Sequence, residues 1–514
     1  MAAVRADEEF IEKTTTLALE EKSKLIKSLR RFDMVFFTVC AIVVLDTLGA
    51  TASYGPQGFL WLVVLAVLFV VPYALVMAEV GGTFTQEGGP YEWTKLAFNR
   101  FQAVITSVLY WITNPLWIGG SLAFVATAAW NDNIAHVSSG SFWDYVFKLL
   151  FIWFSVVAAI IALRRGKWIP NVGTYLRAFV LGFFTITAVI YAIDHGVHGF
   201  PVNDLKPTGV IFLALVPLLL FNYFGFELQN GAAEEMENPQ RDVPLAVVRS
   251  GVMAVFMYVV PILWILLVLP GRALSGIGSF LDAVTAVFSV YGGAAHALRV
   301  VMAICFIGAL MTAGSVWLIG SDRVLAVAAY DGAFHPFFGR FNRRFGTPVR
   351  VNVMSGIIAS IFMIIAVAAF NGGTNSKFVV VLDIAISCTL LSYLWIFPAA
   401  LRLRYSHGHV HRPYRVPGGQ RGMWISTALI TVWVVLGSWV AVFPGTLEKL
   451  FGLSYDFHGT WGVSRGTFEA LTLGTLAVVL LIAIVGYAAG RQVRKTAVEV
   501  PIAEQAGPEV AAAG

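Results

Sequence analysis

The stretch NYFGFELQNG, Asn222 to Gly231, interrupts an apolar run that begins near Val210 and would otherwise be a plain membrane span. It places Glu227 at bilayer depth, together with amide side chains and two glycines. An ionised group at that depth costs about 2.5 to 3.5 kcal/mol on insertion scales, so Glu227 is a candidate functional residue. Non-helical backbone persists inside a membrane only where protein or a water-filled cavity satisfies its polar groups. The stretch therefore predicts a broken helix that lines a cavity.

A second interruption lies near the start of the chain. The first apolar segment runs from about Met34 to Leu45 and then meets DTLGATASYGP, Asp46 to Pro56. It too has one acid beside small residues that weaken a helix. Paired interruptions in corresponding positions of two halves point to the central site of a transporter. We therefore expect the site between these two segments, with Asp46 either contacting substrate or a cation, or forming a structural pair with another helix.

Composition sets the class of protein. The chain has 514 residues, of which 58% are hydrophobic and only 13% charged, and its mean hydropathy is +0.76. By these values the chain is far too apolar for a soluble protein of this length, which indicates an all-α polytopic membrane protein. Apolar runs of sufficient length predict twelve spans, at about 34–54, 57–80, 101–130, 147–164, 171–193, 209–233, 248–269, 297–328, 351–370, 377–401, 423–443 and 467–490.

The distribution of basic residues predicts the orientation of these spans. Of the 35 lysines and arginines, 27 fall on the side that holds both ends of the chain, 7 fall on the other side, and Arg177 lies within a span. Because cytoplasmic loops are enriched in lysine and arginine, both termini are expected in the cytoplasm. The net charge of +5 then reflects topology, and no nucleic-acid partner is expected. The default location is the cell membrane.

The spans divide the chain into four parts. Residues 1–30 form a cytoplasmic N-terminal tail, and residues 31–405 form a transporter core of ten spans. Residues 406–490 contain the eleventh and twelfth spans, and residues 491–514 form a cytoplasmic C-terminal tail. Membrane lipid is therefore a necessary partner of the chain.

The sequence gives no sign of a metal or cofactor. All three cysteines fall within predicted spans without a CxxC pair, so neither a disulfide nor a metal framework is implied. His407, His409 and His411 alternate in an arginine-rich loop. Metal binding is one interpretation of that spacing, but a solvated cytoplasmic loop is favoured over it. No cofactor is expected.

Three motifs resemble those of a known family. They are FTQEGGPY at 84–91, preceded by Glu79; GFE at 225–227, followed by EMENPQRDVP at 235–244; and DRVL at 322–325, followed by YDG at 330–332. Together they resemble the amino acid/polyamine/organocation (APC) superfamily of permeases, in order and spacing, over about residues 30–405. The piece that continues the first motif to Arg100 is too short in apolar length to span, and predicts an interfacial segment.

The resemblance implies a fold and an activity. It implies a five-plus-five inverted repeat whose first and sixth spans are unwound at mid-membrane, with the eleventh and twelfth spans appended. It also implies alternating access for amino acids or related amines. The two interruptions inferred from residue chemistry fall where this fold places its substrate.

Further residues complete the predicted site. Thr47 and Gly49 flank the first interruption, and Phe224 and Gly225 flank the second. Trp117 and Trp317 are candidate walls of the pocket, although a tryptophan in a membrane bundle also serves for packing or as an interface anchor.

Two hydroxyl residues are candidates for a coupling-ion site. Thr312 and Ser315 could bind a cation near the first span, although small polar residues also join helices by hydrogen bonds. The co-ion alternatives are a proton and sodium.

The predicted function is a secondary active amino-acid permease, with the substrate amine bound near Asp46 and Glu227. Free carbonyls and amides at helix breaks suit a zwitterion, and the two acids favour amine-rich substrates. The alternative is a polyamine or other amine permease or exchanger, followed by a non-transporting membrane sensor. An enzyme is not expected, because the sequence has no HExxH or GxSxG motif and no convincing dyad.

Overall fold

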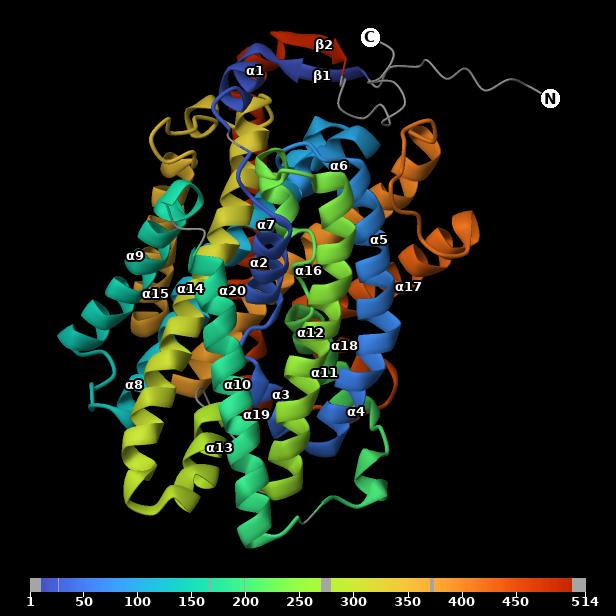
Figure 1. Cartoon of the computed structure of the whole chain (residues 1–514). Helices are drawn as coiled ribbons and strands as arrows, with labels where there is room; N and C mark the ends of the chain where they lie inside the picture. The colour runs from blue at the N-terminus through green and yellow to red at the C-terminus, as the bar shows by residue number, and fades with distance from the viewer. Residues whose placement is uncertain are drawn as a thin grey trace.

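The computed structural model describes residues 11–25, 27–165, 168–197, 199–269, 279–369 and 374–501. Over this part of the chain the protein is almost entirely helical, and ten helical segments are long and apolar enough to cross a membrane. Figure 1 shows them packed side by side into one bundle. Residues 1–10 and 502–514 of the predicted tails lie outside the described residues.

The ten segments are built from thirteen helices, some of which join across short irregular turns. They are α4 (Gly55–Leu65) with α5 (Val71–Thr83), α7 (Arg100–Trp117) with α8 (Ala123–Asn133), α9 (Phe142–Arg165), α10 (Trp168–His195), α12 (Pro239–Val268), α13 (Ser279–Val287) with α14 (Ala295–Tyr330), α15 (Val349–Ala369), α16 (Thr374–Ser406), α17 (Gly419–Val442) and α20 (Arg465–Ala489). Turns of π-helix at Ala66–Val70 and Ile118–Leu122 join the first two pairs, and a 3-10 turn at Phe288–Ala294 joins the third.

Two further spans are broken, as predicted. The first consists of α2 (Arg31–Ile42) and α3 (Leu48–Ser53), separated by the residues around Asp46. The second consists of α11 (Gly209–Asn222) and a 3-10 helix at Leu228–Glu235, separated by Tyr223 to Glu227. Together with the ten segments above, these two broken segments correspond to the predicted polytopic fold with breaks in its first and sixth spans.

The gap between α2 and α3 is stabilised by side chains from two other helices. The Tyr258 hydroxyl on α12 donates to the Ile42 carbonyl at 2.8 Å and accepts from the Val44 amide at 2.8 Å. Arg177 on α10 donates to the Val43 carbonyl at 2.6 Å. Because non-helical backbone inside a membrane needs partners, these bonds take the place of the helical ones that the break removes. The unwound segment is therefore a fixed part of the fold.

The break after α11 depends on a glycine. Gly225 has a φ of +124°, which side chains with a Cβ rarely adopt. Its amide donates to the Tyr73 hydroxyl of α5 at 3.2 Å. A Cβ at this position would also lie 3.2 Å from the Trp317 ring of α14. Gly225 thus allows the chain to turn close to α14.

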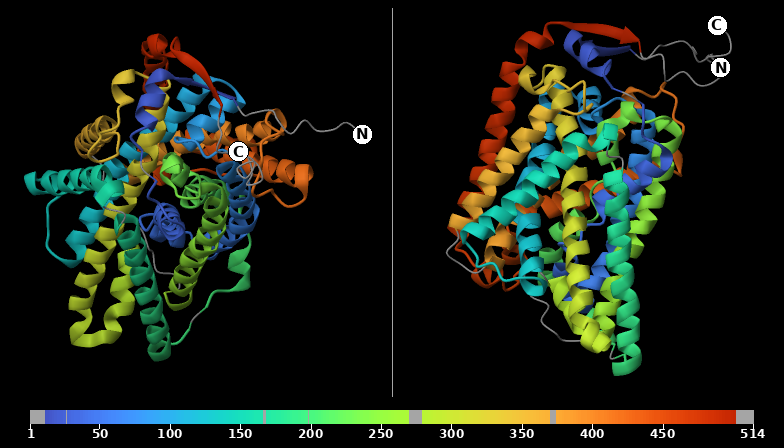
Figure 2. Two further views of the ribbon diagram at one scale, coloured as in Figure 1. Left: turned by 45° about the horizontal axis from the view of Figure 1, so that its top comes forward. Right: turned by 60° about the vertical axis from the view of Figure 1, so that its left-hand side comes forward.

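The two tails pair with each other, which the sequence analysis did not predict. Strands β1 (Ile11–Thr15) and β2 (Ala497–Pro501) form an antiparallel ribbon that lies across one end of the bundle, called here the strand end (Figures 1 and 2). The short helices α1 (Thr16–Lys22) and α21 (Arg491–Arg494) adjoin it. Thr15 donates to the Tyr330 carbonyl at 2.6 Å, so the ribbon is fixed to the end of α14. The predicted all-α polytopic class is confirmed, and this two-stranded ribbon is a local addition to it among the described residues.

The segment expected at the membrane interface is instead buried. Helix α6 (Gly89–Ala97) lies at the strand end, and Tyr91 and Trp93 are fully buried there. Tyr91 donates to Asp331 at 2.6 Å, and Trp93 donates to the Phe84 carbonyl at 3.2 Å. The sequence showed only that the segment is too short to span. Its polar partners come from distant parts of the chain.

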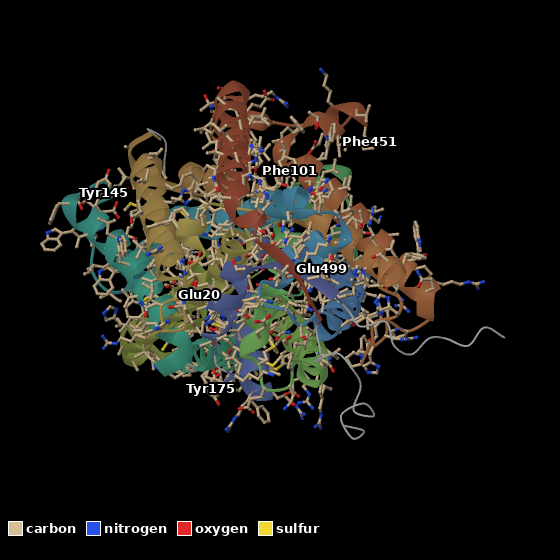
Figure 3. The ribbon with its side chains drawn as sticks, turned by 90° about the horizontal axis from the view of Figure 1, so that it is seen from above. Glu20, Phe101, Tyr145, Tyr175, Phe451 and Glu499 are labelled. Carbon is tan, nitrogen blue, oxygen red and sulfur yellow. The ribbon has the colours of Figure 1, made fainter. Side chains whose placement is uncertain are left out.

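The remaining elements are short connections. They are α18 (Thr446–Leu450), α19 (Phe457–Trp461), and 3-10 turns at Val202–Leu205 and Pro336–Phe338. Large apolar side chains such as Phe154, Ile186, Phe256 and Ile361 are exposed on the outer helices, as expected where lipid is the solvent. Figure 3 looks onto the strand end and shows Tyr145 and Tyr175 at the rim of the bundle.

Candidate substrate site

Asp46 is held by one of its two carboxylate oxygens. Oδ2 accepts hydrogen bonds from Trp117 Nε1 at 2.9 Å and from Ser121 Oγ at 2.8 Å. Trp117 ends α7 and Ser121 lies in the π-helical turn that follows. Among the described residues, Oδ1 has no hydrogen-bond partner although Asp46 is 93% buried. Asp46 therefore offers one fixed acceptor oxygen in the middle of the bundle.

Two further acceptors lie on the elements around Asp46. The side-chain oxygens of Asn114 and Asn222 are buried and have no hydrogen-bond partner in the described part of the chain. Asn114 is one helical turn before Trp117 on α7, and Asn222 ends α11 beside Phe221. The Asn222 amide nitrogen donates to Thr51 Oγ1 of α3 at 3.0 Å. The Thr47 hydroxyl is likewise buried without a partner, and it can donate as well as accept, so acceptor oxygens make up most of the unsatisfied side-chain atoms around Asp46 in the described residues.

Glu227 has a different environment, because phenol groups occupy both of its oxygens. Tyr110 donates to Oε1 at 2.7 Å and Tyr393 donates to the same oxygen at 2.5 Å, while Tyr73 donates to Oε2. The three tyrosines come from α7, α16 and α5, and all of them are fully buried or nearly so. In this structure Glu227 has no free oxygen for a ligand. We call Tyr73, Tyr110 and Tyr393 the tyrosine cage.

Aromatic rings connect the two carboxylates. The Trp117 ring lies 5.9 Å from Phe221 and 6.3 Å from Trp317, and Trp317 lies 6.2 Å from Tyr110 of the cage. The predicted walls Trp117 and Trp317 therefore come together between the two breaks. Trp317 also donates to the Ala41 carbonyl in the last turn of α2 at 2.9 Å. Phe224 stacks on the Tyr393 ring at 4.2 Å.

The two predicted residues at the start of α3 have roles in packing. The carbonyl of Thr47 accepts from the amide and hydroxyl of Thr51, which closes the first turn of α3. A Cβ on Gly49 would collide with Ser279 and Phe280 of α13, so the glycine allows these two helices to touch. Both residues shape the site without offering it a side-chain charge.

Thr312, one of the two predicted coupling-ion residues, is hydrogen-bonded to the buried guanidinium of Arg177. Arg177 is fully buried and donates to Thr312 Oγ1 at 3.1 Å, to the Ala309 carbonyl at 2.9 Å and to the Gly173 carbonyl at 2.6 Å. It also holds the Val43 carbonyl in the break of the first span. Ser315 donates within its own helix, to Met311 at 2.8 Å. Of the two hydroxyls expected to bind a cation, that of Thr312 thus already contacts a guanidinium.

The three sequence motifs meet at the strand end and close it. Arg323 donates to Glu87 at 3.1 Å, to Glu235 at 2.6 Å and to the Gly346 carbonyl at 2.8 Å, and all three charged groups are buried. Burial raises the pKa of Glu87, the nearby Glu235 raises it further, and Arg323 opposes both. Asp331 accepts from Arg100 at 2.8 Å. These charges seal the bundle between the site and the strand end.

Sequence reasoning missed the residues that organise the site. Tyr73, Tyr110, Tyr258 and Tyr393 stand in apolar runs, and Arg177 was counted only as a charge within a span. The available signal was chemical, because a phenol or guanidinium at membrane depth needs a hydrogen-bond partner. That signal identifies the residues as important but gives no partner, since the partners are up to 320 residues away, as for Tyr73 and Tyr393.

Comparisons with known proteins agree with this architecture. Residues 29–455 match the model of a family described as amino acid permease. An uncharacterized transporter of Legionella pneumophila is 29% identical over 76% of this chain and 84% of its own. A protein of Lactococcus lactis named as a probable agmatine/putrescine antiporter is 26% identical over 81% and 88%. A glutamate/gamma-aminobutyrate antiporter of the same species is 21% identical over 82% of each chain.

A solved structure supports the fold. The crystal structure of a mutant manganese transporter of Eremococcus coleocola superimposes with a TM-score of 0.57 at 10% identity, covering 90% of this chain and 94% of that one. At this identity the likeness concerns the fold alone. The family match extends over most of the chain, including both breaks and all three motifs. The chain therefore belongs to the amino acid permease family of the APC superfamily of membrane transporters.

Proposed function

We propose that this protein is an alternating-access permease that exchanges organic amines, and that the substrate ammonium binds Oδ1 of Asp46. The observation that carries the proposal is the half-satisfied Asp46 carboxylate, fixed by Trp117 and Ser121 and left open on one oxygen. A buried carboxylate oxygen without a partner is costly. An ammonium group would satisfy both its charge and its hydrogen-bonding capacity.

The surrounding acceptors favour the same ligand. A primary ammonium has three N–H donors and no acceptor. Asp46, Asn114 and Asn222 offer three unsatisfied oxygens on neighbouring elements. A substrate carboxylate would instead need donors, and the nearest side-chain donors, on Trp117 and Ser121, are engaged with Asp46. The site is thus better matched to an amine than to an acid.

The aromatic walls add to this preference. The Trp117 ring lies 5.9 Å from the Phe221 ring and 6.3 Å from the Trp317 ring, between Asp46 and the tyrosine cage. A cation over such rings gains about 0.5 to 2 kcal/mol, depending on how far it is desolvated. The methylene chain of a diamine would also pack against them.

Glu227 acts in this proposal through the tyrosine cage. Its oxygens are occupied, so it contributes negative potential and orients Tyr110 toward Trp317. It is a positioning residue, whereas Asp46 is the binding residue. This separates the two carboxylates that the sequence analysis had assigned jointly to the substrate amine.

Arg177 replaces the coupling cation in this proposal. A permanent positive charge against Thr312, Val43 and Ala309 would repel a second cation at these oxygens. Transport should therefore not depend on sodium. Counter-substrate exchange, as the names of the two antiporter relatives describe for those proteins, is the favoured mode.

A second candidate is an amino-acid permease, the first interpretation of the sequence. The family description and the relative named as a glutamate/gamma-aminobutyrate antiporter favour it. The relatives are transporters, which supports a non-enzymatic role. For either substrate, the excess of basic residues on the side of the termini favours a cell-membrane protein with both ends in the cytoplasm.

The test is exchange in proteoliposomes. Purified protein would be given labelled putrescine, lysine, glutamate or gamma-aminobutyrate outside, with unlabelled counter-substrate inside or absent, in sodium or potassium buffer. We expect saturable uptake of the amines, stimulated by internal amine and equal in both buffers. Asp46→Asn removes the charge partner of the ammonium, which costs about 2 kcal/mol or more and should raise KM roughly 30-fold or more.

Asp194→Asn is the matched control, because Asp194 is an exposed acid at the end of α10. It should leave KM unchanged. An unchanged KM in Asp46→Asn would refute the assignment of the binding residue. Uptake of glutamate without any uptake of putrescine or lysine would refute amine selectivity and favour the second candidate. Uptake only in sodium buffer would refute the role given to Arg177.

A further inference from the structure

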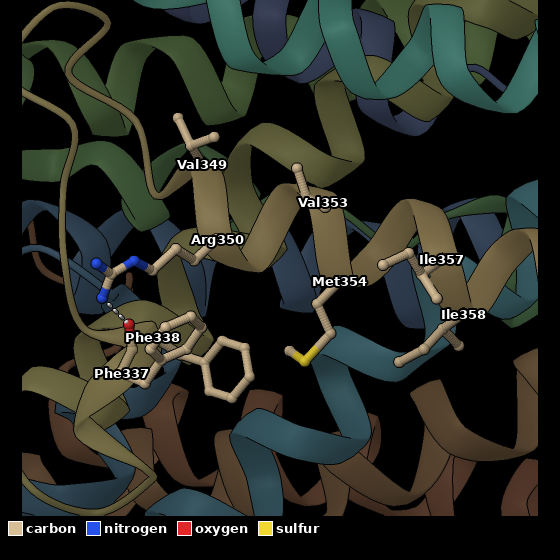
Figure 4. A pocket seen from close by; sticks show the side chains of 8 residues that line it. All are labelled: Phe337, Phe338, Val349, Arg350, Val353, Met354, Ile357 and Ile358. Carbon is tan, nitrogen blue, oxygen red and sulfur yellow. Dashed lines mark hydrogen bonds between the residues drawn. The ribbon is translucent and has the colours of Figure 1, made fainter.

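An apolar groove lies on the outside of the bundle at the first turns of α15. It encloses about 430 Å³ and is lined by α15 and by the 3-10 turn Pro336–Phe338 (Figure 4). Figure 4 shows Phe337 and Phe338 facing Val353, Met354 and Ile357 across it. The groove lies outside the substrate site, since none of its lining residues belongs to either helix break.

One charged residue lies at the end of this groove. Arg350 donates to the Phe337 carbonyl at 2.8 Å, and its guanidinium lies 4.3 Å from the centre of the Phe337 ring. The side chain is exposed and has no ion-pair partner among the described residues. Arg350 is therefore fixed in place with part of its guanidinium free to bind an anion.

The sequence around the groove has an unbalanced charge. From Gly332 to Ala369 it contains four arginines, including Arg350, and no acidic residue. Arg340 is paired with Glu20 and Glu21 of the N-terminal segment, at 2.9 Å in each case. No carboxylate of this stretch is available to neutralise Arg350. Charge complementarity thus favours an anionic occupant.

The position of the groove relative to the membrane indicates the class of occupant. Arg350 lies in the first turn of α15, and Ile357 and Ile361 continue the exposed apolar face of that helix. The rise of an α-helix places Ile358 about 12 Å below Arg350. A charged group about one headgroup's depth above an apolar groove matches a lipid, whose phosphate lies above the upper part of its acyl chain.

We propose that the groove binds an anionic glycerophospholipid of the leaflet on the strand end, with one acyl chain between Phe338 and α15 and the phosphate on Arg350. A second copy of this chain is a poorer occupant, because it would bring another acid-free, arginine-containing segment against this one. The proposal is independent of the substrate assigned above.

The experiment is native mass spectrometry of the full-length protein titrated with phosphatidylglycerol or phosphatidylcholine. The wild type should retain one phosphatidylglycerol in preference to phosphatidylcholine. Arg350→Gln should lower that preference about fivefold, the usual effect of one basic residue on an anionic lipid. Arg350→Lys should keep most of it. Val353→Trp, which fills the groove, should reduce retention of both lipids.

The control is Arg421→Gln, because Arg421 is an exposed arginine in the first turn of α17 and does not line this groove. It should behave as the wild type. Unchanged lipid retention in both Arg350→Gln and Val353→Trp would overturn the proposal. An equal loss in Arg421→Gln would overturn it as well, since the effect would then be one of general surface charge. A cross-linked dimer through cysteines placed at Ile357 would identify the occupant as a second copy and overturn the lipid.

Discussion

At the scale of single residues, the two intramembrane carboxylates differ in how many hydrogen bonds they already accept. Asp46 has two donors on one oxygen and none on the other, while Glu227 has three phenol donors over both. A saturated carboxylate is stable in the absence of substrate, whereas a half-saturated one gains from a ligand. This difference is the basis on which we propose that Asp46 binds the substrate and Glu227 positions the tyrosine cage.

Tyr393→Phe tests the tyrosine cage. It removes one charge-assisted hydrogen bond, so we expect a loss of about 1.5 to 3 kcal/mol in the free energy of unfolding. Thermal unfolding of the solubilised protein would measure it. In a Glu227→Gln background the same substitution should cost less, because the charge that strengthens the bond is absent.

Tyr223→Phe is the control for this prediction. Tyr223 is also fully buried, but its hydroxyl donates to the Leu62 carbonyl at 3.0 Å and not to Glu227. Its cost should therefore be the same with and without Glu227→Gln. If Tyr393→Phe likewise showed no coupling to Glu227→Gln, the cage would not be an energetic unit.

At the scale of elements, each broken helix is stabilised by side chains from continuous ones. Tyr258 and Arg177 bind the backbone of the first break, and Tyr73 binds that of the second. Each of these residues lies on a different helix, respectively α12, α10 and α5. Movement of these helices relative to the breaks would change the site directly. The alternating access that we propose would act on the site through these contacts.

Gly225→Ala should disrupt the second break. The backbone of the break would hold alanine at a φ near +124°, and its methyl group would lie 3.2 Å from the Trp317 ring. We expect a loss of about 1 to 3 kcal/mol in the free energy of unfolding, measured by thermal unfolding, together with reduced transport. Gly182→Ala is the matched control: Gly182 lies within α10 with nothing within 4 Å of the added Cβ, so alanine should be neutral or stabilising. Equal melting temperatures for the two variants would contradict this role of Gly225.

The loop after α16 should loosen at acid pH. Burial lowers the pKa of His407, and the neighbouring His409 and Arg412 lower it further. A lowered pKa means that the folded loop favours the neutral form of His407. The resulting contribution to the stability of the loop is therefore complete above the ordinary histidine pKa of about 6.5. It is lost as the pH falls through the lower pKa of the folded state. The His407 ring contacts Phe84, and its carbonyl accepts from Arg412 at 3.1 Å.

Hydrogen exchange of residues 406–416, corrected for the intrinsic rate, would measure this effect at about pH 7.5 and about pH 5. We expect faster exchange at the lower pH in the wild type and a much smaller difference in His407→Gln. His458→Gln, at an exposed histidine of α19, should retain the wild-type response. A pH response that persists unchanged in His407→Gln would assign it to another group.

At the scale of the whole molecule, one buried charge network closes the strand end. Arg323 of α14 binds Glu87 before α6 and Glu235 after the second break. Nearby, Lys22 of α1 pairs with Glu234 at 2.7 Å. The N-terminal segment, the second break and α14 are thus joined at this end. Opening it requires these pairs to separate.

Arg323→Gln should strongly destabilise the closed form. It leaves two buried carboxylates without their shared cation, which costs about 3 to 5 kcal/mol. Thermal unfolding would measure the loss, and Glu87→Gln combined with Arg323→Gln should recover part of it by removing one of the stranded charges. Arg421→Gln, at an exposed arginine of α17, is the control and should change little. If Arg323→Gln had the same melting temperature as the control variant, the charge network would not stabilise this end of the bundle.

Much of the fold was predictable because the membrane restricts it. The polytopic class, the spans and both breaks follow from the lengths of apolar runs and from the cost of placing Asp46 and Glu227 at depth. The strand ribbon and the buried position of α6 were not predictable. They depend on contacts between segments far apart in the chain, such as Thr15 with Tyr330 and Tyr91 with Asp331.

The sequence by itself determined where the two breaks fall and identified Asp46 and Glu227 as candidate functional residues, since a charge or a glycine in an apolar run has a cost that needs a compensating role. Only the tertiary structure decided what each of them does. It gave Glu227 three tyrosines, left Asp46 one open oxygen, and placed Arg177 beside Thr312. The physical reason is that a carboxylate's function depends on how many of its hydrogen bonds are already made, and those partners come from helices that are neighbours in space but distant in sequence.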